Sequence, residues 1–168
     1  MTCPLIILGS SRKESDTKKL VDLLFSNLEV KMIDLLDQKI SPYNYEEKYP
    51  EEDNFMQIID IILKHEKIIF ATPVYWYAMS GIMKTFFDRF SDLVTTRKEI
   101  GRKLKGRKTF LVSVGADISM PEGFEIPFRL TSEYLDMNFI STYYCKMNKV
   151  IEINPEALAF IDQVKSTQ

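Results

Sequence analysis

Residues 67–90 of the chain read KIIFATPVYWYAMSGIMKTFFDRF. The first six residues form a mostly apolar run that is typical of a buried strand. Pro73 cannot donate a hydrogen bond to a neighbouring strand, so the chain must leave the sheet there. An aromatic loop follows, and after Ser80-Gly81 the spacing of the apolar residues predicts an amphipathic helix. A strand that leads through a loop into a helix is one unit of an α/β sheet, and such sheets bind ligands at the carboxyl ends of their strands.

The same alternation of strand and helix runs along the whole chain. Apolar runs predict strands, and apolar residues at helical spacing lie between them. The predicted strands cover residues 4–8, 29–34, 67–72, 109–114 and 140–147, and the predicted helices begin near residues 17, 54, 81, 127 and 154. In the last helix, Leu158 and Ile161 are expected to face inward. This order predicts a single α/β domain, residues 1–168, built as a doubly wound three-layer α/β/α sandwich around a parallel sheet.

The composition excludes several classes of protein. A chain of 168 residues with 45% hydrophobic and 27% charged residues is typical of a soluble globular domain. Its net charge of −2 gives no reason to expect nucleic acid or an anionic membrane as a partner. Cys3 and Cys145 lack the spacing of metal ligands and cannot form a disulfide framework, so we expect a cytoplasmic protein. No run approaches the roughly 20 apolar residues of a membrane span.

The loop after the first strand, residues 9–17, has the side chains that a phosphate group needs. Hydroxyls and a guanidinium precede a helix N-terminus, where the helix dipole favours an anion. The candidate binding residues are Ser10, Arg12, Ser15, Asp16 and Thr17. The alternative is an ordinary loop in which Ser15 or Asp16 caps the helix. The loop matches neither the dinucleotide-binding glycine motif nor the P-loop.

The aromatic loop after Pro73 suits a planar ligand. Residues 74–77 are Val, Tyr, Trp and Tyr, which offer backbone donors and flat ring faces. A large planar ring needs both of these features. Because this loop and the phosphate loop follow strands of one sheet, together they suggest a flavin site. The alternative is that Trp76 and Tyr77 belong to the core or to a subunit interface.

Two motifs make the chain similar to the flavodoxin-like, NAD(P)H-dependent FMN reductase family. The motif G-S-x-R-x-x-S-x-T is matched from Gly9 to Thr17, and P-V-Y-W-Y-x-M-S-G-x-x-K-x-F-x-D-R is matched from Pro73 to Arg89. Weaker similarity extends through residues 42–43, 101–102 and 121–124. The resemblance implies a flavodoxin-like five-stranded parallel sheet of order 2-1-3-4-5, with FMN at its carboxyl edge.

The resemblance also implies roles for individual residues. The first loop would hold the FMN phosphate, and two further loops would border the isoalloxazine ring. The implied ring contacts are Pro73, Val74, Tyr75 and Trp76 on one side and Gly115, Ala116 and Asp117 on the other. Many relatives have two glycines where this chain has Gly115-Ala116. Related iron–sulfur flavoproteins carry a cysteine cluster after strand two, and residues 35–53 contain no cysteine, so no cluster is expected here.

The implied activity is reduction of a small acceptor by NADH or NADPH through FMN. The acceptor would be a quinone, a free flavin, an azo compound or a nitro compound, and the resemblance implies a homodimer. One alternative is a flavodoxin-like electron carrier that docks with proteins, although the near-neutral charge and Arg12 count against it. Another is a structural or interaction protein that keeps the fold without FMN, because fold alone does not define function.

Three other features have simpler interpretations. His65 is expected to be a solvated cap at a helix end. Asp88-Arg89 is expected to be an exposed or half-buried pair on one helix. The basic residues between positions 97 and 108 are expected to form a solvated connection, with attraction of a nicotinamide phosphate as the alternative.

Overall fold

All five strands lie parallel in one sheet. A computed structural model describes residues 2–148 and 153–166 of the chain. Within these residues the strand order is β2-β1-β3-β4-β5, which confirms the predicted order. The strands are β1 (Leu5–Leu8), β2 (Lys31–Asp34), β3 (Lys67–Pro73), β4 (Lys108–Gly115) and β5 (Asn138–Lys146).

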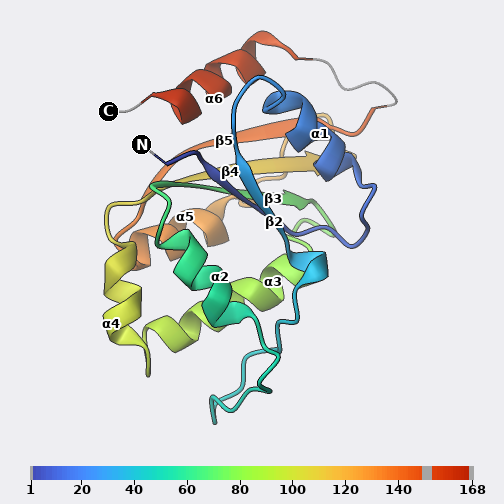
Figure 1. The fold of residues 1–168 in the computed structure, drawn as a ribbon. Coiled ribbons are helices and arrows are strands. Elements are labelled where there is room, and N and C mark those ends of the chain that lie inside the picture. Colours follow the sequence, from blue (N-terminus) through green and yellow to red (C-terminus); the bar gives the residue numbers. More distant parts are fainter. Residues whose placement is uncertain (1, 149–152, 167–168) are drawn as a thin grey trace.

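Helices cover both faces of the sheet and give the three predicted layers (Figure 1). Helices α1 (Asp16–Leu24) and α6 (Pro155–Lys165) lie on one face. On the other face lie α2 (Phe55–Ile62), α3 (Gly81–Asp88) and α5 (Ile126–Tyr134). The short helix α4 (Lys98–Gly101) and the 3₁₀ turns η2 (Arg89–Leu93) and η3 (Arg102–Leu104) connect α3 to β4, and η1 (Leu35–Asp37) follows β2.

Strand β1 is covered by helices on both faces of the sheet. Its four residues are all buried, with at most 1% exposure. Leu5 and Ile7 pack with the helices on one face, whereas Ile6 and Leu8 pack with α1 and α6 on the other. A strand that is covered on both faces needs a continuous apolar run, so the sequence pattern follows from the architecture.

Aromatic side chains fix α3 on the sheet. The ring centroid of Phe87 lies 4.9 Å from that of Phe70 on β3 and 5.0 Å from that of Phe128 on α5. Phe86 is fully buried in the same cluster. Edge-to-face pairs of this kind add stabilisation beyond the area that they bury. The packing holds the first residue of α3 at the carboxyl edge of the sheet, where it meets the loop after β1.

Helix α6 corrects one prediction. Its buried residues are Ala157, Phe160, Ile161 and Val164, which form a single helical stripe. Leu158 lies beside this stripe and is 54% exposed, so the expectation that it faces inward is wrong. The Lys67 ammonium donates to the carbonyl oxygens of Val164 at 2.7 Å and Ser166 at 2.6 Å. A cation at a helix C-terminus is favourable, and here it ties the last helix to the start of β3.

His65 is also placed differently from the prediction. It is only 7% exposed, and its Nδ1 lies 2.7 Å from the carbonyl oxygen of Cys3. Helix α2 ends at Ile62, so His65 stands in the short connection to β3 and packs under the start of the chain rather than facing solvent.

Candidate functional site

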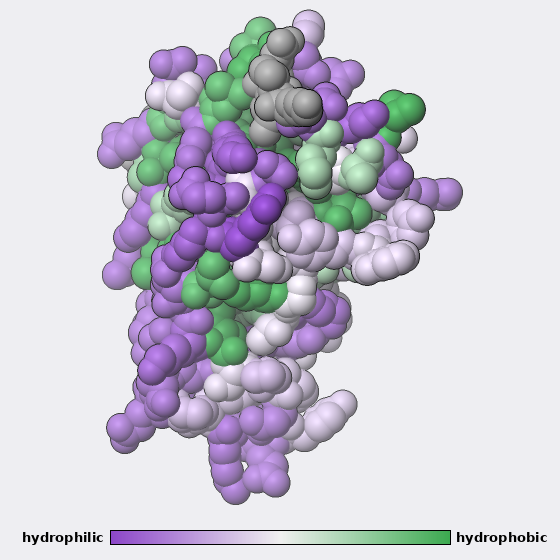
Figure 2. Space-filling view, turned by 90° about the vertical axis from the view of Figure 1, so that its right-hand side faces the viewer, coloured by the Kyte–Doolittle hydropathy of each residue, from purple (hydrophilic) through white to green (hydrophobic). Residues whose placement is uncertain are grey.

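The carboxyl edge of the sheet brings three loops together. These are residues 9–15 after β1, residues 74–80 after β3 and residues 115–119 after β4, and the three strands are neighbours in the sheet. Figure 2 looks toward this edge and shows residues of intermediate hydropathy gathered across its middle, with hydrophilic residues beside them. The loops contain or adjoin all of the predicted site residues.

The first two loops are joined by direct hydrogen bonds. The Ser80 hydroxyl donates to the Gly9 carbonyl at 2.6 Å and accepts from the Met83 amide at 3.2 Å. Ser80 is therefore both the N-cap of α3 and a link to the first loop. A Cβ on Gly9 would lie 2.9 Å from the Cβ of Met83, so this close approach requires glycine. Sequence reasoning treated Ser80 only as a helix start.

Two buried hydroxyls, one in the first loop and one in the first turn of α1, have no partner within the described part of the chain. Ser10 and Thr17 are each 1% exposed, and neither Ser10 Oγ nor Thr17 Oγ1 forms a hydrogen bond within residues 2–148 and 153–166. Leaving a buried polar group unpaired costs about 1–3 kcal/mol. Thr17 lies in the first turn of α1, where the helix dipole favours an anion, and Ser10 lies in the loop that leads into this helix. Two donors in this position fit the oxygens of a phosphate group.

The other three candidates in this loop have partners within the chain. Ser15 Oγ accepts from the Lys18 amide at 3.1 Å, so Ser15 caps α1 and its hydroxyl proton is still available to a ligand. Asp16 Oδ2 lies 3.3 Å from Arg12 Nη2, and its other oxygen lies 3.3 Å from Lys19 Nζ. The Asp16 carboxylate would repel a phosphate, so its position suits it to orient Arg12, whose side chain is 67% exposed.

The aromatic loop is a tight two-residue turn. Tyr75 and Ala78 exchange both backbone hydrogen bonds, at 2.9 and 3.0 Å. The central residues, Trp76 and Tyr77, have φ values of 50° and 64°, which are uncommon for large side chains. Their exposures are 93% and 70%, which excludes the alternative that they belong to the core of this chain. Aromatic residues with a left-handed backbone conformation just after a strand are strained, and such strain is found at functional sites.

The third loop packs directly against the second. The Val74 amide donates to the Val114 carbonyl at 2.8 Å. A Cβ on Gly115 would lie 3.2 Å from Val74 Cβ and 2.7 Å from the hydroxyl of Tyr144, so a side chain at this position would displace the end of Tyr144. Ala116 and Asp117 are exposed. Tyr144 was not predicted, although the strand order by itself puts the end of β5 beside this loop.

Away from this edge, Arg89 is the centre of a buried ion network. Its side chain is 1% exposed, and it donates to Asp92 from Nε and to Asp53 from Nη1, both at 2.8 Å. Asp88 is half-exposed and pairs with Lys84, whereas the buried position of Arg89 contradicts the expectation of an exposed or half-buried pair. Burial raises the pKa of Asp53, but hydrogen bonds from Arg89 and from the Ser41 amide outweigh this effect and hold the pKa below its ordinary value.

This network fastens the long loop after β2 to the helical layer. The Tyr49 hydroxyl donates to Asp92 at 2.9 Å, and the guanidinium of Arg89 lies 3.4 Å from the centroid of the Tyr49 ring. Cation–π contact and charge-assisted hydrogen bonds therefore act on the same side chain.

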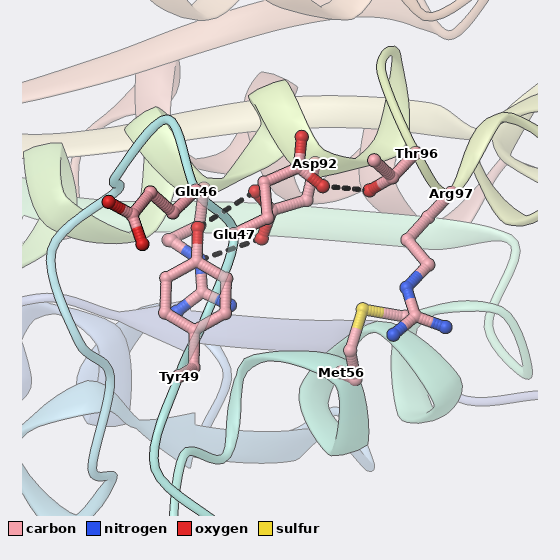
Figure 3. Close-up of a pocket in the computed structure, with 8 residues that line it drawn as sticks. Glu46, Glu47, Tyr49, Met56, Asp92, Thr96 and Arg97 are labelled. Atoms are coloured by element: carbon pink, nitrogen blue, oxygen red, sulfur yellow. Dashed lines mark hydrogen bonds and ion pairs between the residues drawn. The ribbon is translucent and has the colours of Figure 1, made fainter.

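A pocket of about 360 Å³ lies beside this network (Figure 3). It is lined by Glu46, Glu47, Tyr49, Met56, Arg89, Asp92, Thr96 and Arg97. None of these residues comes from the three loops at the carboxyl edge. Asp92 is engaged by Arg89 and Tyr49, and Glu47 accepts from the hydroxyls of Thr95 and Thr96. The polar groups of this pocket thus serve mainly to hold the long loop.

The basic run lies at the opposite edge of the sheet. It ends at Lys108, the first residue of β4, whereas the candidate site follows the last residue of that strand. Eight strand residues span about 25 Å. Arg107 caps α2 by donating to the carbonyl oxygens of Ile62 at 3.3 Å and Leu63 at 2.5 Å. This position does not support the alternative that the run attracts a nicotinamide phosphate to the site.

Residues 2–148 and 153–166 contain neither a metal-binding cluster nor a membrane-spanning helix. No group of three or more His, Cys, Asp or Glu side chains there is arranged to hold a metal ion. No helix in the same part of the chain has both the length and the apolar character needed to cross a membrane.

The sheet order, with three loops meeting at the carboxyl edge of the sheet, defines a flavodoxin-like fold. Residues 4–151 match the family of NADPH-dependent FMN reductases. The chain belongs to this family, whose members are FMN-dependent oxidoreductases, and the resemblance seen in the sequence is confirmed.

Individual relatives agree with this assignment. The chain is 30% identical over 94 residues to a Bacillus subtilis protein named as an NAD(P)H-dependent FMN-containing oxidoreductase, YwqN, covering 54% of the chain and 52% of that relative. The chain thus spans about half the length of this relative. It is 27% identical over 151 residues to the uncharacterized NAD(P)H oxidoreductase YrkL of the same organism, covering 75% of the chain and 83% of YrkL.

A solved structure supports the fold. The Trp repressor binding protein from Bacillus subtilis superposes with a TM-score of 0.69 at 23% identity, over 96% of this chain and 95% of that one. At this identity the likeness concerns the fold alone.

Proposed function

We propose that this protein binds FMN and passes electrons from NADH or NADPH to a small acceptor such as a quinone, a free flavin, an azo compound or a nitro compound. The observation that carries the proposal is the pair of unpartnered buried hydroxyls, Ser10 and Thr17, in a member of the FMN reductase family. When bound, FMN would supply the redox chemistry by accepting hydride and releasing electrons, while the protein supplies binding and orientation.

The first loop would hold the phosphate. Ser10 and Thr17 would each donate a hydroxyl proton, Ser15 would add a third, and Arg12 would supply charge-assisted donors. This donor set suits a terminal phosphate monoester. The sequence shows no second glycine motif for an adenosine diphosphate half, which favours FMN over FAD.

The other two loops would border the ring. The Val74 and Tyr75 amides already donate within the chain, to Val114 and Ala78. Hydrogen-bond donors to the edge of the ring would therefore be the backbone amides of Trp76, Ala116 or Asp117. Pro73, Val74 and Gly115 would make van der Waals contact with the ring. Fixed amide dipoles near the ring would stabilise negative charge in its reduced form without a proton-transferring side chain.

We further propose a homodimer. Trp76, Tyr77 and Tyr75 are 93%, 70% and 43% exposed in the single chain, which is a large apolar projection for a monomer. A second copy would cover this turn. A sedimentation experiment at micromolar concentration tests the assembly, and a monomer would contradict it.

Cys3 and Cys145 are both free thiols, which supports a reducing compartment such as the cytoplasm.

The absorption spectrum of the purified protein, loaded with FMN if necessary, tests the central proposal. We expect a flavin spectrum, release of FMN with no stoichiometric FAD in mass analysis, and anaerobic bleaching by NADH or NADPH. Failure to bind FMN, or stoichiometric FAD, would overturn the cofactor assignment. Bleaching by dithionite but by neither nicotinamide would overturn the reductase assignment in favour of an electron carrier.

A further inference from the structure

Tyr144 joins the edge strand β5 to the third loop of the candidate site. Its hydroxyl donates to the Asp117 carbonyl at 2.8 Å. Its ring lies against Gly115, because Cε2 and the hydroxyl are 3.1 and 2.7 Å from the point where a Gly115 Cβ would stand. Val74 Cβ lies 3.2 Å from the same point. Tyr144 is thus in contact with the loop that also touches the aromatic turn.

The rest of the third loop has few attachments. Gly115 is held by the Met147 amide, which donates to its carbonyl at 2.7 Å. Residues 116–119 are exposed, and the bond from Tyr144 is the only hydrogen bond that they make within the described part of the chain. Within the described residues, the phenol of Tyr144 is therefore the one hydrogen-bonding group that can hold this segment.

The bond also sets the direction of a peptide unit. In a trans peptide the C=O and N–H groups point in opposite directions. Because the Asp117 carbonyl points to Tyr144, the amide N–H of the next residue, Ile118, points away from Tyr144. A segment whose peptide direction is fixed presents the same donors each time a ligand arrives, which is the basis of preorganised electrostatics.

We propose that Tyr144 is a positioning residue that holds residues 116–118 in the conformation in which they border the bound flavin. The proposal rests on the proposed function, and it concerns FMN affinity and the midpoint potential of the bound flavin rather than any chemical step. No proton moves through the phenol. Its role is to fix a neighbouring backbone.

The test compares Tyr144→Phe with Tyr143→Phe. Both changes remove one phenolic hydroxyl from neighbouring residues of β5, but the Tyr143 hydroxyl lies 3.4 Å from Asn154 at the start of α6, away from the loop. We expect Tyr144→Phe to weaken FMN binding about three- to tenfold and to shift the midpoint potential. We expect Tyr143→Phe to leave both unchanged. If Tyr144→Phe also leaves both unchanged, the proposal is overturned.

A second arm needs no flavin. In the FMN-free protein, ¹⁵N relaxation of the backbone should show greater mobility of residues 116–118 in Tyr144→Phe than in the wild type or in Tyr143→Phe. Equal rigidity in all three would contradict the positioning role. If the wild type bound no FMN, the proposed function would fail, while this arm would still decide whether Tyr144 holds the loop.

A Gly115→Ala substitution adds a check on the contact itself. The new methyl group would meet the Tyr144 hydroxyl, so Gly115→Ala should weaken FMN binding less in the Tyr144→Phe background than in the wild type. Purely additive effects would indicate that the two residues act independently and would count against the proposal.

Discussion

The Ser80 hydroxyl and the Gly9 carbonyl, 71 positions apart in sequence, are joined by a hydrogen bond of 2.6 Å. The same hydroxyl caps α3. The loop that would bind the phosphate and the loop that would border the ring are therefore held at a fixed separation by one fully buried side chain. The affinity for a ligand whose phosphate and ring are joined by a chain of definite length would therefore depend on this separation.

Ser80→Ala removes both bonds at once. We expect the FMN-free protein to lose about 1–3 kcal/mol of stability, because an N-cap is lost and the Gly9 carbonyl is left without this donor. FMN affinity should fall as well, since the two loops are no longer linked. Chemical denaturation and fluorescence titration measure the two effects. Ser26→Ala is the control, because the Ser26 hydroxyl bonds only to Leu23 in the exposed turn after α1. An unchanged FMN affinity in Ser80→Ala would refute the linkage.

Arg12→Ala should affect ligand binding and leave the fold intact. Loss of a charge-assisted donor costs about 1.5–3 kcal/mol, or roughly one to two decades in FMN affinity. The melting temperature without FMN should change little, because the side chain is 67% exposed. Arg102→Ala is a matched control, since Arg102 is 72% exposed and pairs with Glu99 near the opposite edge. If both variants bind FMN as the wild type does, Arg12 is not part of the site.

Thr17→Val should have opposite effects on stability and on binding. Valine has nearly the same shape as threonine and lacks the unpartnered buried hydroxyl, so the FMN-free protein should be as stable as the wild type or more stable. FMN affinity should fall, because a phosphate donor is lost. Scanning calorimetry of the FMN-free protein measures the change in stability, and titration calorimetry with FMN measures the change in affinity. Lower stability together with normal FMN binding would show that this hydroxyl serves the fold alone.

The Arg89 network predicts sensitivity to acid. The pKa of Asp53 is depressed in the folded state, so its contribution to stability is present above the unfolded pKa of about 4 and is lost as the pH falls through the lower folded value. Asp53→Asn should lower stability at neutral pH and flatten the dependence of unfolding free energy on pH below about 4. Asp88→Asn, at a half-exposed site, is the control. An equally steep acid dependence in Asp53→Asn would exclude Asp53 as its source.

Turnover should follow an alternating scheme. The proposed ring-binding loops leave one exposed flavin face, so nicotinamide and acceptor should use that face in turn. Steady-state double-reciprocal lines at several acceptor concentrations should then be parallel. Intersecting lines would indicate that both substrates bind together.

Much of the fold was accessible from the sequence because parallel strands leave a simple pattern. Strands β1, β3 and β4 are buried on both faces, so β1 is wholly apolar and β3 and β4 are mostly so. The edge strands were predicted less sharply: β2 begins at Lys31 rather than residue 29, and β5 covers 138–146 rather than 140–147. An edge strand is only partly covered, and its pattern is correspondingly mixed.

The candidate loops could also be predicted, because the carboxyl ends of neighbouring parallel strands meet at one edge. The contacts between them could not. Tyr144 reaches Asp117 across 27 residues, and Arg89 reaches Asp53 across 36, with no local pattern that marks either pair. The error at Arg89 has a physical cause: adjacent helical residues point in different directions, so Asp88 stays half-exposed while Arg89 is buried.

The bond from Lys67 to the end of α6 bears on how the chain folds during synthesis. It joins residues 97 or more positions apart, and the face of the sheet under α6 includes Phe110, whose ring lies 5.9 Å from that of Phe160. While the ribosome is still making the segment before α6, that apolar face has only α1 to cover it. A nascent chain at this stage resembles an aggregation-prone intermediate, and the sheet is sealed on this side only when residues 155–165 have emerged.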